Sequence, residues 1–282
     1  MNFETLKLNQ DGAILTVTLS NPPVNLISEQ MVQELFQLGG FLINNPEIRV
    51  VVIDSADPDF FLAHMDLNAI IAAETDPTKQ SRYADMNVLQ SLGLSWQNLP
   101  QVKIVKVAGR CRGGGLELAL AMDMRFASES AVFCAPEAAG GFVPAGGGTT
   151  RTMMAAGPGR AMEIILSARD FTAQEAERYG LINRCLPDDE LDAYVDTLAK
   201  RIALRSPPVV GMVRSVFGAA SAPFVEPLFA GFAAENEGIR VGLAGDEMGP
   251  MMQIHLEAGQ ARELELDLPA TMDGFIAKRS GQ

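Results

Sequence analysis

Two glutamates, each beside a cluster of glycines, are the residues of this sequence best suited to chemistry. Gly113–Gly115 separate a strand-like apolar run from a helix-like one, and Glu117 falls in the first turn of the helix-like run. Glu137 precedes a second group of glycines at 140–148. Backbone N–H groups at the start of a helix stabilise negative charge. Two carboxyl groups beside such donors can take and give protons next to a carbonyl group, so the pattern indicates this type of proton transfer.

Both features also have a plainer interpretation. Gly113–Gly115 could serve only to let a helix pack tightly on a sheet. Glu117 could face solvent and complement the helix dipole. However, the surrounding Leu and Ala residues leave little polar face for an exposed carboxylate. Nucleotide motifs do not match either, because G-x-G-x-x-G fails at Leu118 and neither G-x-x-x-x-G-K-[ST] nor G-x-S-x-G occurs. The residues are therefore consistent with an anion or oxyanion site of another kind.

The elements that would position these glutamates alternate between strands and helices. Asp11-Gly12 lies between the alternating runs 3–8 and 13–19, which predicts a hairpin. Helical spacing occupies 31–43, interrupted by Gly39-Gly40. Further strand patterns occupy 50–53, 101–108, 125–127 and 131–134. This alternation predicts an α/β fold.

Helices dominate the later sequence. Pro158 suits the first turn of one helix, and Thr172 with Glu175 forms a capping box for another, which Gly180 can end. An amphipathic run occupies 191–204, a further helix begins near Pro207, and no strand pattern follows. We therefore expect an α/β core with the active site at 1–205 and a helical region at 206–282.

Composition excludes several classes of protein. The 282 residues are 48% hydrophobic and 20% charged, which is typical of a globular chain, and the net charge of −13 argues against a nucleic-acid or anionic-membrane partner. The three cysteines, Cys111, Cys134 and Cys185, fit neither a disulfide framework nor a zinc motif. The sequence shows no signal peptide and no membrane-spanning run. We expect a cytoplasmic protein without a metal.

The sequence resembles the crotonase superfamily, the enoyl-CoA hydratase/isomerase family, over nearly its whole length. Short runs at 159–184 and 274–279 contribute to the likeness. The most specific motifs are NPPVNLIS at 21–28, FLAHMDL at 61–67, AGRCRGGGLELALAMDMRFAS at 108–128 and FCAPEAAGGFVPAGGGTTR at 133–151. The resemblance implies a spiral of ββα repeats with a C-terminal helical trimerisation region.

The resemblance also implies catalytic roles. The backbone N–H groups of Met65 and Gly114 match the two donors of the family's oxyanion hole, which holds the thioester oxygen. Glu117 matches the residue that acts with the nucleophilic water, and Glu137 matches the residue that exchanges the proton at Cα. The joint involvement of the two glutamates is expected even if their individual roles differ, because a coupled pair shares its titration.

Coenzyme A in this family lies along the backbone of early segments. The positions that correspond here are Val24, Ala63, Met65, Asp66, Leu67, Asn68 and Gly114. Phe275 and Lys278 match tail residues that reach the coenzyme A of a neighbouring subunit.

Two positions depart from the family pattern. His64 replaces a common glycine beside Met65, and it would strain the loop if that position needed a positive φ. We expect His64 to be structural, with lining of the acyl pocket or contact with coenzyme A as the alternative. Asn68 stands where many relatives have lysine, which removes a phosphate contact.

The implied function is that of an enoyl-CoA hydratase, which adds water reversibly and in syn geometry to a trans-2-enoyl-CoA. Coenzyme A would be part of the substrate, and no separate cofactor is expected. Isomerisation of the double bond is the alternative, because one carboxylate at Glu137 is enough for it. A third alternative is a non-catalytic acyl-CoA-binding trimer in which His64 has spoiled the oxyanion hole. A homotrimer or a dimer of trimers is expected.

Overall fold

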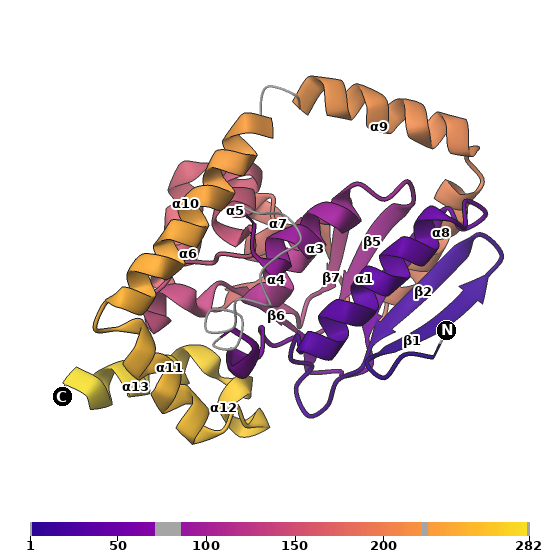
Figure 1. Ribbon diagram of the computed structural model, residues 1–282. Helices are drawn as coiled ribbons and strands as arrows, with labels where there is room; N and C mark the ends of the chain where they lie inside the picture. Colours follow the sequence, from indigo (N-terminus) through magenta and orange to yellow (C-terminus); the bar gives the residue numbers. More distant parts are fainter. Residues whose placement is uncertain (1, 71–85, 222–224, 281–282) are drawn as a thin grey trace.

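Two sheets form the centre of the computed structural model, which describes residues 2–70, 86–221 and 225–280 (Figure 1). In the larger sheet only β1 and β2 are antiparallel, and in the smaller one only β8 and β9. The larger sheet has the order β1 (Leu6–Asp11), β2 (Ile14–Leu19), β3 (Val50–Ser55), β5 (Val102–Val107), β7 (Met124–Ser128) and β10 (Arg184–Leu186). The smaller sheet has the order β4 (Phe60–Leu62), β6 (Arg110–Arg112), β8 (Val132–Cys134) and β9 (Phe171–Thr172).

A repeated unit of two strands and a helix builds this arrangement. A strand of the larger sheet is followed by a short strand of the smaller sheet and then by a helix, three times in succession. The units are β3–β4–α3, β5–β6–α4 and β7–β8–α5, with α3 (Val88–Gln97), α4 (Gly114–Leu120) and α5 (Gly148–Ala156). Because α4 follows directly on β6, the first glycine cluster stands at the carboxyl end of that strand, whereas a short 3₁₀ helix, η2 (Pro136–Gly140), lies between β8 and α5.

The N-terminal elements follow the predicted pattern with one exception. β1 and β2 form the predicted hairpin, in which Asp11 pairs with Ile14. Helix α1 (Glu29–Ile43) is not interrupted at Gly39-Gly40. Its buried face, which includes Leu35 and Leu38, packs continuously on the core, and this burial outweighs a helix-propensity cost of about 1 kcal/mol per glycine.

The next helices begin where their capping residues predict. Pro158 opens α6 (Pro158–Ser167), and Thr172 and Glu175 form the capping box of α7 (Ala173–Tyr179). Gly180 ends α7 with a φ of +83°. Glu137 lies in a short 3₁₀ helix, η2 (Pro136–Gly140), and α8 is Leu191–Ala203.

Beyond residue 205 the described residues form helices only, as predicted. They are α9 (Pro207–Ser221), α10 (Val225–Ala244), α11 (Met248–Ala258), α12 (Arg262–Leu266) and α13 (Leu268–Ser280). Helix α10 packs on α5, and α11 and α13 pack on η2, whereas α9 lies apart from them at the edge of the molecule (Figure 1). Among the described helices, none combines the length and the apolar character needed to cross a bilayer. The division at residue 205 stays a prediction.

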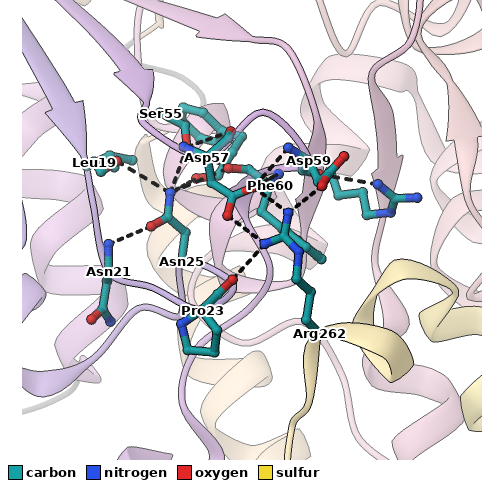
Figure 2. Close-up of polar contacts among 11 residues, drawn as sticks. Leu19, Asn21, Pro23, Asn25, Ser55, Asp57, Asp59, Phe60 and Arg262 are labelled. Carbon is teal, nitrogen blue, oxygen red and sulfur yellow. Dashed lines mark hydrogen bonds and ion pairs between the residues drawn. The ribbon is translucent and has the colours of Figure 1, made fainter.

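Arg262 links the start of α12 to the loop between β2 and α1, which contains Pro23 (Figure 2). Its guanidinium donates to the Pro23 carbonyl at 2.7 Å and to Asp57 at 2.6 Å, and it pairs with Asp59 as well. The C-terminal region therefore holds the segment that carries Val24, one of the predicted coenzyme A positions.

Candidate active site

A cavity of about 610 Å³ contains both predicted glutamates. Its floor carries Glu117 and Glu137, and most of its wall is apolar. Helices α3, α10 and α11 contribute to the wall, together with Ile70, which directly precedes residues 71–85 outside the described part of the chain. The apolar lining includes Met65, Leu89, Phe142, Met251, Met252 and Met272.

Glu117 is buried and accepts hydrogen bonds from the second glycine cluster. Its Oε1 receives the N–H groups of Gly146 at 2.6 Å and Gly148 at 2.8 Å. A Cβ atom at Gly146 would lie 2.6 Å from Glu117 Oε2, and one at Gly148 would lie 2.6 Å from Oε1. Glycine is therefore needed at both positions, and the interpretation of Glu117 as a solvent-exposed residue is wrong.

Glu137 faces the first glycine cluster. A Cβ at Gly113, whose φ is +48°, would lie 3.0 Å from Glu137 Oε1. The other oxygen, Oε2, is buried and has no hydrogen-bond partner among the described residues. A carboxyl oxygen in that position is available to exchange a proton with a bound molecule.

Burial makes both carboxyl groups weak acids. It raises the pKa of Glu137 to about 7, although the positive charge of His64 acts in the opposite direction. Burial also raises the pKa of Glu117 well above its usual value; the charges of Glu137 and Glu235 add to this, and the two glycine N–H groups oppose it. Because like charges in one buried site disfavour each other, ionisation of one carboxyl group opposes ionisation of the other.

The two predicted oxyanion donors lie side by side. Gly114 is the first residue of α4, where the backbone N–H has no partner within the helix. A Cβ on Gly114 would lie 3.4 Å from Met65 Cβ. The loop at Met65 is fixed by backbone pairing with Ile27, whose N–H donates to the His64 carbonyl at 2.9 Å. Gly115 fits the interpretation that glycine lets the helix pack tightly on the sheet, because a Cβ at this position would lie 2.6 Å from Leu62 Cβ.

The remaining predicted coenzyme A positions fall into two groups. Val24 and Ala63 are fully buried, backbone included, in a small apolar cluster, and a contact of either with coenzyme A stays a prediction. Asp66 follows Met65, and Leu67 and Asn68 begin a helical turn after it, where the Asp66 side chain accepts the Asn68 N–H at 3.0 Å. The contact of Phe275 and Lys278, both on α13, with a neighbouring subunit's ligand stays a prediction.

His64 is buried without the backbone strain that a glycine-only position would impose, because it is not among the residues with positive φ. It lines the cavity, and its Nε2 lies 3.0 Å from Oε1 of Glu265 in α12. His255 Nε2 lies 3.1 Å from the same oxygen. Within the described parts of the chain, these three side chains are the one group of His, Cys, Asp and Glu close enough to share a metal ion. Nitrogen–oxygen distances of this length are those of direct hydrogen bonds, and we treat the group as a hydrogen-bonded cluster.

Sequence analysis missed the contribution of the C-terminal helices to this site. Glu235 of α10 is buried and accepts the N–H groups of Gly147 and Thr150, each at 2.8 Å. Gly147 lies between the two glycines that bind Glu117, so α10 holds the loop that holds Glu117. The only sequence signal was a glutamate within the apolar run LFAGFAAE, which also fits an exposed position.

Comparison with known proteins agrees with this geometry. The model of the enoyl-CoA hydratase/isomerase family matches residues 9–247. Carnitinyl-CoA dehydratase of Escherichia coli strain K12 is 32% identical over 230 residues, which cover 80% of this chain and 85% of that protein. Carnitinyl-CoA dehydratase of Salmonella typhi is 33% identical over 227 residues, or 79% of this chain and 84% of that protein.

Solved structures share the fold. A candidate enoyl-CoA hydratase of Streptomyces avermitilis superposes with a TM-score of 0.89 at 36% identity, covering 98% of this chain and 99% of that one. An enoyl-CoA hydratase/carnitine racemase of Magnetospirillum magneticum gives a TM-score of 0.70 at 30% identity, covering 79% and 83%. The predicted crotonase-like α/β fold is thus confirmed. On these grounds the chain belongs to the enoyl-CoA hydratase/isomerase family.

Proposed function

We propose that the protein is an enoyl-CoA hydratase that adds water reversibly to a trans-2-enoyl-CoA thioester. The observation that carries the proposal is a pair of buried carboxyl groups, Glu117 and Glu137, that line one cavity, where burial raises the pKa of both. Hydration needs one group to take a proton from water and another to give one to carbon. An isomerase needs only one such group, so the burial of Glu117 favours hydration.

The proposed mechanism uses these groups and two backbone donors. Glu117 takes a proton from water as the water oxygen bonds to Cβ of the enoyl group. The electrons of the double bond move toward the thioester, and the N–H groups of Met65 and Gly114 stabilise the enolate oxygen. Glu137 then gives its proton to Cα on the same face, which produces syn addition. The pair returns to its starting state when Glu117 loses its proton and Glu137 regains one by exchange through water. No separate cofactor takes part, and coenzyme A is part of the substrate.

The dehydration direction is equally open to this pair. The similar carnitinyl-CoA dehydratases are named for the removal of water from carnitinyl-CoA. Mixing the protein with crotonyl-CoA and longer trans-2-enoyl-CoAs tests the proposal, because hydration removes the absorbance of the enoyl thioester. Carnitinyl-CoA belongs in the same panel. If no chain length is turned over in either direction, the hydratase proposal fails and a non-catalytic acyl-CoA-binding role is favoured.

The opposed ionisation of the two carboxyl groups predicts a bell-shaped dependence of kcat on pH. Either direction needs one ionised and one protonated carboxyl. Activity should therefore rise as pH passes about 7, where the first group of the pair ionises, and fall at higher pH, where the second ionises. Initial rates measured at constant ionic strength check this. A profile that is flat across the neutral range would contradict a shared proton between Glu117 and Glu137.

We also propose that the protein assembles as a trimer or a dimer of trimers. An apolar stripe on α9 supports this: its side chains follow helical spacing and are 42–66% exposed in the single chain. The stripe consists of Val209, Met212, Val213, Val216 and Phe217.

Charging this stripe should disrupt the assembly. Replacing Val216 and Phe217 together by lysine is expected to yield smaller species in sedimentation velocity, because burying two charges in an apolar interface is unfavourable. Ser215→Lys, on another side of the same helix, is the matched control and should leave the assembly intact. An unchanged mass for the double variant would exclude this stripe from the interface.

The proposed compartment is the cytoplasm. The three cysteines are free and widely spaced, as is common where thiols stay reduced.

A further inference from the structure

The chain contains two histidines, and the fold brings both to a single buried carboxylate. His64 comes from the loop that carries Met65, one of the two predicted oxyanion donors, and we call this loop the oxyanion loop. His255 comes from α11 and Glu265 from α12. The two histidines are each 6% exposed and Glu265 is 0% exposed. The cluster therefore joins the C-terminal region to the loop that carries Met65, at the wall of the cavity, which His64 and His255 both line.

Both ring nitrogens of His64 face hydrogen-bond acceptors. Its Nδ1 lies 2.8 Å from the Met65 carbonyl oxygen, which can only accept. Its Nε2 lies 3.0 Å from Glu265 Oε1. A neutral imidazole has one N–H and cannot donate on both sides. The second proton belongs on the ring rather than on Glu265, because imidazole is the stronger base, with an ordinary pKa of about 6.5 against about 4.3 for a carboxyl.

The electrostatic surroundings agree with this protonation state. Burial alone would lower the pKa of His64, but Glu265, the Met65 carbonyl and the charge of Glu137 together raise it. For Glu265, burial acts to raise the pKa, but the hydrogen bonds from His255 and His64 outweigh burial and hold it at about 2. The groups that face His64 from the packed elements are thus Glu265, His255 and Glu137, with the Met65 carbonyl.

We propose that Glu265 holds His64 as an imidazolium, and that this clamp positions the oxyanion loop and places a fixed positive charge beside Glu137. The catalytic part of this inference rests on the proposed hydratase function. The location supports it: a Cβ on Gly113 would lie 3.0 Å from Glu137 Oε1 and 3.1 Å from His64 Cβ. A positive charge there stabilises the negative charge that develops on the thioester oxygen and on Glu137.

The clamp is itself firmly anchored. Arg112 of β6, which is fully buried, donates to the backbone carbonyl of Glu265 and to Asp170 at 2.8 Å. Because both N–H groups of His64 are already used, the ring acts through its charge and through Met65, not by contact with substrate. His64 and Glu265 are therefore positioning residues.

Nitrogen-15 NMR of the imidazole rings tests the clamp directly. Protein without a histidine tag gives signals from two rings only, which His255→Asn assigns. We expect both nitrogens of His64 to carry protons at pH 7, and the ring to titrate above the ordinary histidine range. In Glu265→Gln the titration should move to lower pH, whereas Glu263→Gln, an exposed residue of the same helix, should leave it unchanged.

Kinetics then separate positioning from a purely structural role. Glu265→Gln should lower kcat for hydration on the order of 10-fold to 100-fold with little change in KM, because misplacing a donor acts on the transition state. The Glu263→Gln control should keep both constants.

Three results would overturn the clamp. The first is a neutral His64 ring at pH 7 in the wild-type protein, a measurement that needs no variant to fold. The second is a stoichiometric metal ion in elemental analysis with a metal-shifted histidine nitrogen, which would assign the cluster to a metal site. The third is a Glu265→Gln variant with unchanged titration and kcat. If His64 is an imidazolium but no enoyl-CoA is hydrated, the clamp stands and the proposed function fails.

Discussion

Replacing either Glu117 or Glu137 by glutamine is expected to lower kcat for hydration by about 10²–10⁴-fold, because each substitution removes one of the two groups that move protons. KM should change less, since proton transfer is a feature of the transition state. Glutamine keeps the size of the side chain. It can still accept the N–H groups of Gly146 and Gly148 at position 117, so the fold should be preserved.

The two variants also distinguish hydration from isomerisation. A hydratase should lose activity in both, measured as the fall in enoyl-thioester absorbance under saturating substrate. Near-normal double-bond migration in Glu117→Gln with none in Glu137→Gln would instead identify an isomerase. Glu129→Gln is the matched control, because Glu129 is an exposed residue between β7 and β8. Its rate should equal that of the wild-type protein.

Local signals in the sequence predicted those elements whose determinants lie within a few residues. The Asp11-Gly12 hairpin, the capping box at Thr172 and the end of α7 at Gly180 each depend on backbone conformations or hydrogen bonds between near neighbours. The three-residue strands β4 and β6 were missed, because so short a run shows no alternation that distinguishes a strand from a loop.

The residues of the candidate site also divide into those with a local signal in the sequence and those without one. Glu117 and Glu137 could be found from the glycines beside them, because glycine is needed where a carboxylate approaches the backbone closely. Glu235 and Glu265 could not, because Gly147 and Thr150 lie 88 and 85 residues from Glu235, and His64 lies 201 residues from Glu265, although its other partner, His255, is 10 residues away. Nothing near either residue indicates a buried carboxylate. The helical region at 206–282, which was expected to serve assembly, therefore also supports two loops of the candidate site, those of Gly147 and His64.

Truncation of Glu235 should have the largest effect on stability. Its carboxylate accepts hydrogen bonds from Gly147, Thr150 and Gln90 within the fold. The buried guanidinium of Arg151 interacts with the same negative charge. Glu235→Ala leaves these donors and this cation without their partner, and breaking such a buried arrangement costs about 3–5 kcal/mol.

Urea unfolding at one fixed protein concentration measures this effect, since assembly also contributes to apparent stability. Glu237→Gln is the matched control on α10. Glu237 is exposed and pairs with Arg240, three residues on, so a change below about 1 kcal/mol in the free energy of unfolding is expected.

Glu235→Gln isolates the contribution of the charge. Glutamine retains one acceptor oxygen but directs an NH₂ group toward the loop that contains Gly147. We therefore expect the free energy of unfolding to fall by about 1–3 kcal/mol. Both variants should also lose kcat, because Gly147 sits between the two glycines that hold Glu117. If Glu235→Ala unfolds at the same urea concentration as the Glu237→Gln control, then α10 does not support this loop, and Glu117 is held by the glycine cluster alone.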